Sequence, residues 1–157
     1  MASDAIKIAV MDQQAVIERS KAGKAALEEV KAYQATRQKI ITSDEQELKE
    51  IEQAMKDPNS KLSEATKQEK QEQFQSKVEA YQRRLQDFNR EIQQKQREMA
   101  AEYSKKIADA AQAVAQKEGL AAVIDKGNES MFRIVIYHQP ALDVTDLVVK
   151  EFDRQQN

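Results

Sequence analysis

The side chains in this sequence that could perform acid–base or metal chemistry are one histidine and many carboxylates. His138 is the only histidine in 157 residues, and the chain has no cysteine. An imidazole can act as a general base or bind a metal. A lone histidine at the end of a predicted strand, without cysteine or a second histidine, is more often a surface or interface residue. We therefore predict no catalytic residue and no metal site.

The carboxylates lie among lysines on segments of helical composition, where such residues usually form a solvated face. With only three glycines, the chain has no glycine-rich phosphate loop. The sequence therefore predicts a protein that is not an enzyme and uses no cofactor.

Basic side chains gather in the second half of the predicted helical region. They could bind the phosphates of an anionic glycolipid, but acidic residues alternate with them at helical spacings, and we favour ordinary ion pairing. The basic set is Arg83, Arg84, Arg90, Lys95, Arg97, Lys105 and Lys106, and the acidic set is Glu79, Asp87, Glu91, Glu98 and Glu102.

The composition favours long exposed helices over a compact enzyme. Charged residues make up 33% of the chain and aromatic residues 5%, with no tryptophan and two prolines. The net charge of −2 gives no general attraction to nucleic acid. No apolar run approaches the ~18 residues of a membrane span. No leader follows Met1, so we expect a cytosolic protein or one whose signal peptide lies outside this sequence.

Good helix-forming residues extend from about Gln14 to about Glu118, with one predicted interruption at residues 57–60. Pro58 lacks an amide hydrogen and disfavours the helical conformation at Asp57. Asn59 or Ser60 can cap the helix that follows. We predict a helical hairpin, residues 14–118, with arms from Gln14 to Lys56 and from Lys61 to Glu118 and a tip at 57–60.

The apolar seams of the two arms are imperfect. The heptad rows of the first arm are interrupted by Gln34, Arg37 and Asp44, which a two-stranded coiled coil disfavours. The second arm has an apolar stripe with an 11-residue period. Apolar residues along the arms either pack the hairpin or contact another protein. The candidate contact residues are Leu48, Ile51, Met55, Leu62, Phe74, Val78, Tyr81 and Phe88.

Strand patterns occur only near the two ends of the chain, at residues 6–11, 120–125 and 131–138. Asp12 can cap the helix after the first strand, and Gly119 can end the second arm. A short helix is expected at 147–152. Residues 1–13 and 119–157 bury too little apolar surface alone, so we expect several copies to close one sheet into a small barrel. The predicted interface residues are Ile6, Ile8, Val10, Val123, Ile124, Ile134 and Ile136.

Three segments resemble the Skp/OmpH family of periplasmic chaperones. They are Lys7-Ile8-Ala9-Val10-Met11-Asp12 with Val16-Ile17 and Ser20-x-Ala22-Gly23-Lys24-Ala25 following, then residues 119–125, and Leu142-Asp143-Val144-Thr145-Asp146-Leu147-Val148-Val149. The resemblance implies a jellyfish-like homotrimer, in which the end strands form an intersubunit β-barrel. It also implies a cavity between the arms that holds unfolded outer-membrane proteins without ATP, in the periplasm.

The best-known members of this family are strongly basic, and their arms are proposed to meet anionic lipid and lipopolysaccharide. This chain has a net charge of −2 and arms of mixed charge. We therefore do not carry a lipopolysaccharide or membrane site over to it. Its expected partners are unfolded outer-membrane proteins and further copies of itself.

The main hypothesis is an ATP-independent holdase chaperone. The alternative is a structural coiled-coil adaptor, in which the hairpin is a spacer that presents its tip to a folded partner. A cytosolic prefoldin-like subunit also has a long hairpin, but its strands lie between the helices, whereas here they flank them.

Overall fold

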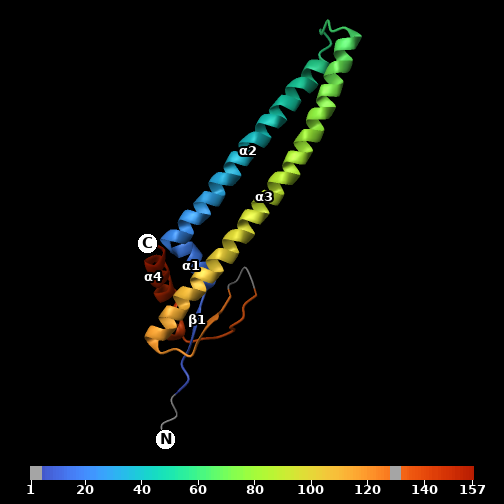
Figure 1. Ribbon diagram of the computed structural model, residues 1–157. Helices are drawn as coiled ribbons and strands as arrows, with labels where there is room; N and C mark the ends of the chain where they lie inside the picture. The colour runs from blue at the N-terminus through green and yellow to red at the C-terminus, as the bar shows by residue number, and fades with distance from the viewer. Residues whose placement is uncertain (1–4, 128–131) are drawn as a thin grey trace. The chain divides into compact units, whose positions relative to one another are not determined.

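The computed structural model describes residues 5–127 and 132–157 (Figure 1). Its elements are β1 (Ile8–Met11), α1 (Gln13–Arg19), α2 (Lys21–Lys56), α3 (Glu64–Glu118), β2 (Ala122–Asp125), the 3₁₀ turn η1 (Pro140–Leu142) and α4 (Thr145–Gln156). The prediction of a mainly helical chain with a small β component is confirmed. Two compact units can be distinguished: the chain-end unit, residues 1–29 and 97–157, and the arm unit, residues 30–96.

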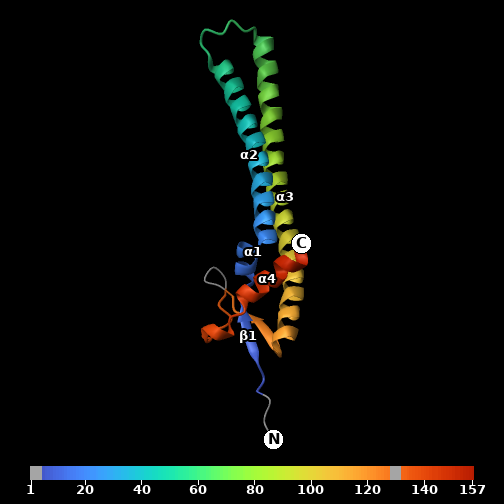
Figure 2. The ribbon, with the colours of Figure 1, turned by 90° about the vertical axis from the view of Figure 1, so that its left-hand side faces the viewer.

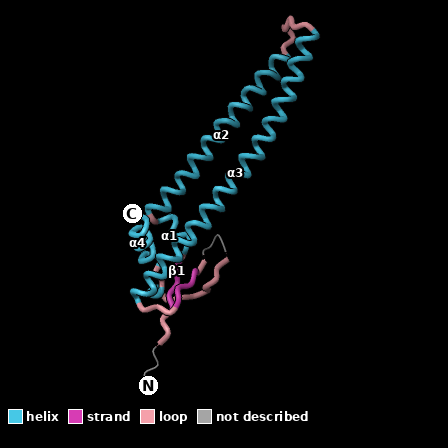
Figure 3. Tube along the Cα trace, viewed as in Figure 1, coloured by secondary structure: helices cyan, strands magenta, loops and turns pink. Residues whose placement is uncertain are grey.

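The small sheet of the chain-end unit pairs β1 with β2 in parallel, from Ile8 opposite Ala122 to Met11 opposite Asp125 (Figure 3). Parallel neighbours require a long crossover connection, and here the whole helical hairpin supplies it. The other edge of β1 is also occupied, because the Val144 amide donates to the Val10 carbonyl at 2.9 Å. The predicted strands at 6–11 and 120–125 are therefore confirmed in shortened form.

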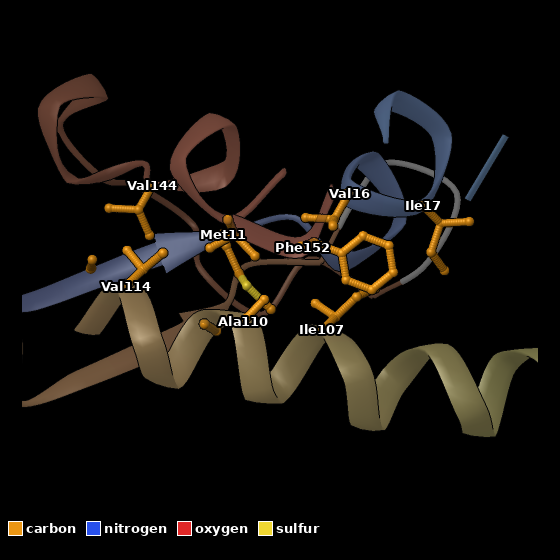
Figure 4. Packing of buried hydrophobic residues seen from close by; sticks show 11 residues of the cluster. Met11, Val16, Ile17, Ile107, Ala110, Val114, Val144 and Phe152 are labelled. Carbon is orange, nitrogen blue, oxygen red and sulfur yellow. The ribbon is translucent and has the colours of Figure 1, made fainter. Parts of the chain in front are cut away.

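The hydrophobic core of the chain-end unit lies where α3, α4 and α1 meet β1 (Figure 4). Ile107, Ala110, Ala111 and Val114 recur at helical spacing on α3 and are buried. They pack with Ala9, Met11, Val16, Ile17, Val144, Val148 and Phe152. The core therefore joins residues from both ends of the chain to the root of the hairpin.

The prediction of one continuous helix from about Gln14 is wrong, because the helix is interrupted at Ser20, between α1 and α2. Ser20 has an extended backbone (φ −71°, ψ 152°). Its hydroxyl accepts a hydrogen bond from the Gly23 amide at 3.0 Å, and Asp153 of α4 accepts one from the Lys21 amide at 2.8 Å. These bonds satisfy amides at the start of α2 that have no partner within the helix, which stabilises the break. The predicted cap Asp12 is confirmed by its bond from the Ala15 amide at 3.0 Å.

The third strand predicted at 131–138 is wrong over residues 132–138, which are not in a strand; Met131 lies outside the described residues. A strand needs a neighbouring backbone, yet here the amides of Ile134 and Val135 both donate to one carbonyl, that of Lys126, at 3.0 and 3.3 Å. Ile134 and Val135 are thus bonded back to Lys126, and Gly127, next to Lys126, has φ +68°. The alternating apolar pattern therefore has no partner strand among the described residues of the chain.

The connection between the arm helices begins at Asp57 and continues to Ser63, beyond the predicted tip at 57–60. The cap of α3 is Ser63, whose hydroxyl accepts a bond from the Thr66 amide at 3.2 Å, so the predicted cap at Asn59 or Ser60 is wrong. At the far end of α3, Gly119 has φ +67°, as expected of a residue that ends a helix. The terminal helix α4 continues to Gln156, past the predicted end at 152.

A partly buried ion pair joins the two ends of the β2–α4 connection. Lys126 Nζ lies 2.6 Å from Asp143 Oδ2, and Asp143 also accepts a bond from the Thr145 amide at 2.9 Å. Burial opposes ionisation of Asp143, but the hydrogen bonds from Lys126 and Thr145 outweigh it and hold the pKa at about 2. The ionised carboxylate therefore stabilises the folded unit at pH values above its ordinary pKa.

Because the pKa of Asp143 is lowered on folding, its contribution to stability is present at neutral pH and is lost as the pH falls from about 4 to about 2. Asp143→Asn is expected to be less stable than wild type by about 2 kcal/mol at pH 7 and to match it near pH 2. Urea unfolding at several pH values checks this. Asp146→Asn, which removes an exposed pair with Arg19, is the control and should change little. A stability difference independent of pH would contradict the assignment.

Candidate functional site

The helices α2 and α3 lie side by side in the arm unit (Figures 1 and 2), and polar side chains form bonds between them. Arg84 of α3 pairs with Asp44 of α2, with an Nη1–Oδ1 distance of 2.6 Å. Two further hydrogen bonds between the helices join Tyr81 to Glu45 at 2.6 Å and Lys77 to Glu47 at 2.7 Å. Asp44, one of the polar residues that interrupt the predicted heptad rows, therefore helps to join the two helices.

A second polar group lies farther from the tip. The Tyr33 hydroxyl donates to Glu91 Oε2 at 2.6 Å, and Arg37 donates to the same oxygen through Nε and Nη2 at 3.3 and 3.2 Å. The bond from Tyr33 and the Arg37 guanidinium lower the pKa of Glu91, and the carboxylate raises the pKa of Tyr33. Arg37 also stacks on aromatic rings, 4.2 Å from the Tyr33 centroid and 5.1 Å from that of Phe88.

The residues predicted to contact another protein are all half-buried, and all except Leu62, which lies in the connection between the helices, belong to α2 or α3. Phe88 lies under Arg37, while Leu48 and Tyr81 line a small hollow of about 100 Å³. The remaining members are Ile51, Met55, Leu62, Phe74 and Val78. In the described part of the arm unit, Ile41 is the only apolar residue that is fully buried. The two helices alone therefore leave much of their apolar surface partly accessible.

A larger hollow, which we call the arm recess, opens between α2 and α3 and has a volume of about 490 Å³. Its apolar lining comes from Ala35, Ile41, Leu85, Phe88 and Ile92, and its polar lining from Lys31, Gln34, Arg37, Gln38 and Asn89. The prediction of contact residues included Phe88 alone among these. Ile41, Leu85 and Ile92 belong to the apolar seams visible in the sequence, but periodicity does not distinguish a seam that closes from one that leaves a hollow.

Apolar side chains of the predicted interface set are exposed on the chain-end unit. Ile6 is 78% exposed, Ile134 66% and Ile136 88%, and Ile8 and Ile124 are also exposed. Phe132 and Tyr137, which the predicted set omits, are exposed beside them in sequence. Val10 is buried and Val123 packs against the core, so both already have contacts within their own chain. These exposed apolar side chains are candidates for contact with another protein chain.

Among the candidate basic residues of α3, Arg83, Arg90 and Lys106 have acidic neighbours on the same helix. Arg83 lies 3.5 Å from Glu79, Arg90 3.8 Å from Asp87, and Lys106 2.6 Å from Glu102. These pairs agree with ordinary pairing along the helix. Within residues 5–127 and 132–157, no helix combines the length and apolar character needed to cross a membrane.

His138 lines a hollow of about 350 Å³ together with Asp12, Lys126 and Arg133. Its Nδ1 lies 3.0 Å from the carbonyl oxygen of the adjacent Gln139. Across the described residues, no group of three or more histidine or carboxylate side chains is placed to hold a metal ion.

Comparison with known proteins places this architecture in a family. The family model for outer membrane protein (OmpH-like) matches residues 7–152. The fold resembles that of a Caulobacter crescentus CB15 protein, a proposed outer membrane chaperone (OmpH-like). The TM-score is 0.82 with 19% identity, covering 98% of this chain and 87% of the other. No curated protein is similar enough to this sequence to count as a relative. Because the family model spans nearly the whole chain, from β1 into α4, this protein belongs to the OmpH-like outer membrane protein family.

Proposed function

We propose that this protein is an ATP-independent holdase chaperone that binds unfolded outer-membrane proteins and prevents their aggregation in the periplasm. The observation that carries the proposal is the half-buried apolar seam of the arm, whose side chains neither helix covers fully. Many weak apolar contacts along one surface bind a non-native chain without a defined sequence motif, because their combined effect supplies the affinity. Membership of the OmpH-like family and the fold shared with a proposed outer membrane chaperone support this role.

The working form in this proposal is a homotrimer whose arms surround a cavity. Residues 1–13 and 119–157 form the trimerisation body, and residues 14–118 form the arm. Support comes from the exposed isoleucines of the chain-end unit, which a monomer would leave in water. The segment 132–138 has the alternating pattern of a strand but no partner strand among the described residues of the chain. A neighbouring copy would supply that partner and extend the sheet toward a closed barrel.

Ile8→Asp and Ile136→Asp are each expected to abolish the trimer, because a carboxylate at the interface would lose its hydration. Ile136 lies outside every helix and strand and is 88% exposed, so its substitution should leave the fold of the chain intact. Sedimentation velocity measures the oligomer and circular dichroism the helix content. Ile40→Asp, at an exposed site in the arm, is the control and should sediment like wild type. Trimeric Ile8→Asp and Ile136→Asp variants would refute the proposed interface.

The holdase activity is tested by diluting a β-barrel membrane protein from urea into buffer, with and without this protein. Light scattering should fall to the level of the buffer alone once the molar concentration of trimers equals that of the diluted membrane protein. Unchanged scattering at a stoichiometric amount of trimers would contradict the proposal. An untreated folded protein of similar size is the control and should neither bind nor scatter.

The alternative function, a spacer that presents its tip to a folded partner, is favoured by the length of α2 and α3. Removing matched 11-residue units from both arms, the apolar period of α3, separates the two functions. A holdase should lose capacity gradually as contact surface is removed. A spacer should fail abruptly once its reach is too short.

A further inference from the structure

We propose that the arm recess binds an aromatic side chain of the client where that side chain lies next to a carboxylate in an extended segment. This inference rests on the proposed holdase function and specifies what the arm recognises. The floor of the recess is apolar, with Ile41 only 5% exposed and Leu85, Phe88 and Ile92 beside it. A hollow of about 490 Å³ lies within the range of roughly 300–1,000 Å³ seen for small-molecule sites. It is large enough for one aromatic side chain and too small for a folded element.

The polar part of the lining selects a non-native chain. Gln34, Gln38 and Asn89 each carry an amide that both donates and accepts hydrogen bonds. An extended, unfolded segment has backbone N–H and C=O groups without partners, whereas those of a folded protein are almost all paired. The side-chain amides can therefore bond the backbone on either side of an inserted ring.

The charges of the lining select the neighbours of that ring. Both ionisable residues of the lining, Lys31 and Arg37, are cationic. Among the described residues, the bonds of Arg37 to Glu91 and Tyr33 use Nε and Nη2, and Nη1 is the donor nitrogen that a client carboxylate would use. A carboxylate beside the aromatic residue is therefore favoured over an ammonium group, and salt should weaken the preference because these cations lie near water.

The experiment titrates trimers of the full chain with unstructured glycine–serine peptides and follows the methyl NMR signals of Ile41 and Ile92. The three peptides carry aspartate–phenylalanine–aspartate, aspartate–alanine–aspartate or lysine–phenylalanine–lysine at their centres. The aspartate–phenylalanine–aspartate peptide should shift both signals, and the shifts should reach a plateau as its concentration rises. The alanine peptide should bind at least about tenfold more weakly, because it lacks the apolar side chain. The lysine peptide should also bind more weakly, by a margin that shrinks at high salt.

Ala35→Phe tests the location, because this substitution adds a ring to the lining and should fill the recess. It is expected to remove the shifts, whereas Ala32→Phe, on the same helix but outside the lining, should keep them. Circular dichroism checks that both variants are folded. Equal binding of the three peptides, no shift with any of them, or unchanged binding by Ala35→Phe would overturn the inference. Shifts that depend on the concentration of this protein and not on the peptide would also overturn it, because a second copy of the chain would then fill the recess.

The aggregation assay separates the failure of this inference from the failure of the proposed function. If wild type suppresses aggregation but no peptide shifts Ile41 or Ile92, the recess assignment is wrong and the holdase function stands. If wild type fails to suppress aggregation, the function on which the recess assignment rests is wrong.

Discussion

Phe152→Ala is expected to destabilise the chain-end unit by about 4 kcal/mol. Phe152 is fully buried, and its ring lies 5.8 Å from that of Tyr103, centroid to centroid. It also packs with Ile107, Val16 and Val148 in the core of that unit. Alanine would lose the transfer free energy of the ring and leave a cavity that the surrounding helices can fill only in part.

The consequence should extend beyond α4, because this helix holds other parts of the unit. Asp153, next to Phe152, accepts the bond from the Lys21 amide at the start of α2. Loss of the ring should therefore loosen the break at Ser20 together with the core. Hydrogen exchange measured on peptides that cover β1, α1 and α4 reports this directly, and it should increase in all three. Phe74→Ala, at a half-buried site in the arm, is the control and should leave their exchange unchanged. If Phe152→Ala and Phe74→Ala increased the exchange of these peptides equally, the assignment of the core would be contradicted.

Gly23→Ala is expected to destabilise the chain-end unit by about 2–3 kcal/mol. Alanine at an exposed helical site usually stabilises by about 1 kcal/mol relative to glycine, so the sign of the effect is diagnostic. A Cβ at residue 23 would lie 1.9 Å from the carbonyl oxygen of Ile17 and 2.7 Å from the Ser20 hydroxyl oxygen. The first of these atoms belongs to the backbone, so α1 and α2 would have to move apart.

Gly119→Ala is the matched control for this prediction. Gly119 has a left-handed backbone, but a Cβ there would meet no atom within 4 Å. Its substitution should cost only the conformational penalty of about 1–2 kcal/mol. Urea unfolding of both variants, followed by the exchange of α1 amides, measures the difference. A Gly23→Ala variant as stable as wild type would mean that the close packing of α1 on α2 is not required.

The parts of the fold that depend on residues close together in the sequence could be predicted. Pro58 ends the first arm, Asp12 caps α1, and Gly119 takes the left-handed conformation after α3. The break at Ser20 was missed because part of its stabilisation comes from Asp153, which is distant in the sequence. The strand expected at 131–138 was wrong over the described residues because alternation indicates a strand only where another backbone can pair with it.

For the arm residues too, some features could be predicted from the sequence and others could not. The apolar stripes correctly located half-buried side chains such as Leu48 and Phe88. The stripes also marked Arg37 and Asp44 as interruptions, whereas these residues bind Glu91 and Arg84 of the facing helix. Glu91 and Arg84 lie farther from Pro58 along the chain than Arg37 and Asp44 do, so the position of the turn alone does not predict these pairs. The hollow beside them depends on how far the helices stand apart, which periodicity does not encode.

The most direct test of the central claim is the mass of the complex between this protein and an outer-membrane protein. Native mass spectrometry would be performed after the client is diluted from urea, and again with the same client already folded in detergent. The account predicts three copies of this chain with one unfolded client, and no complex with the folded client. A complex that contains a single copy of this chain, or equal binding of folded and unfolded client, would contradict it.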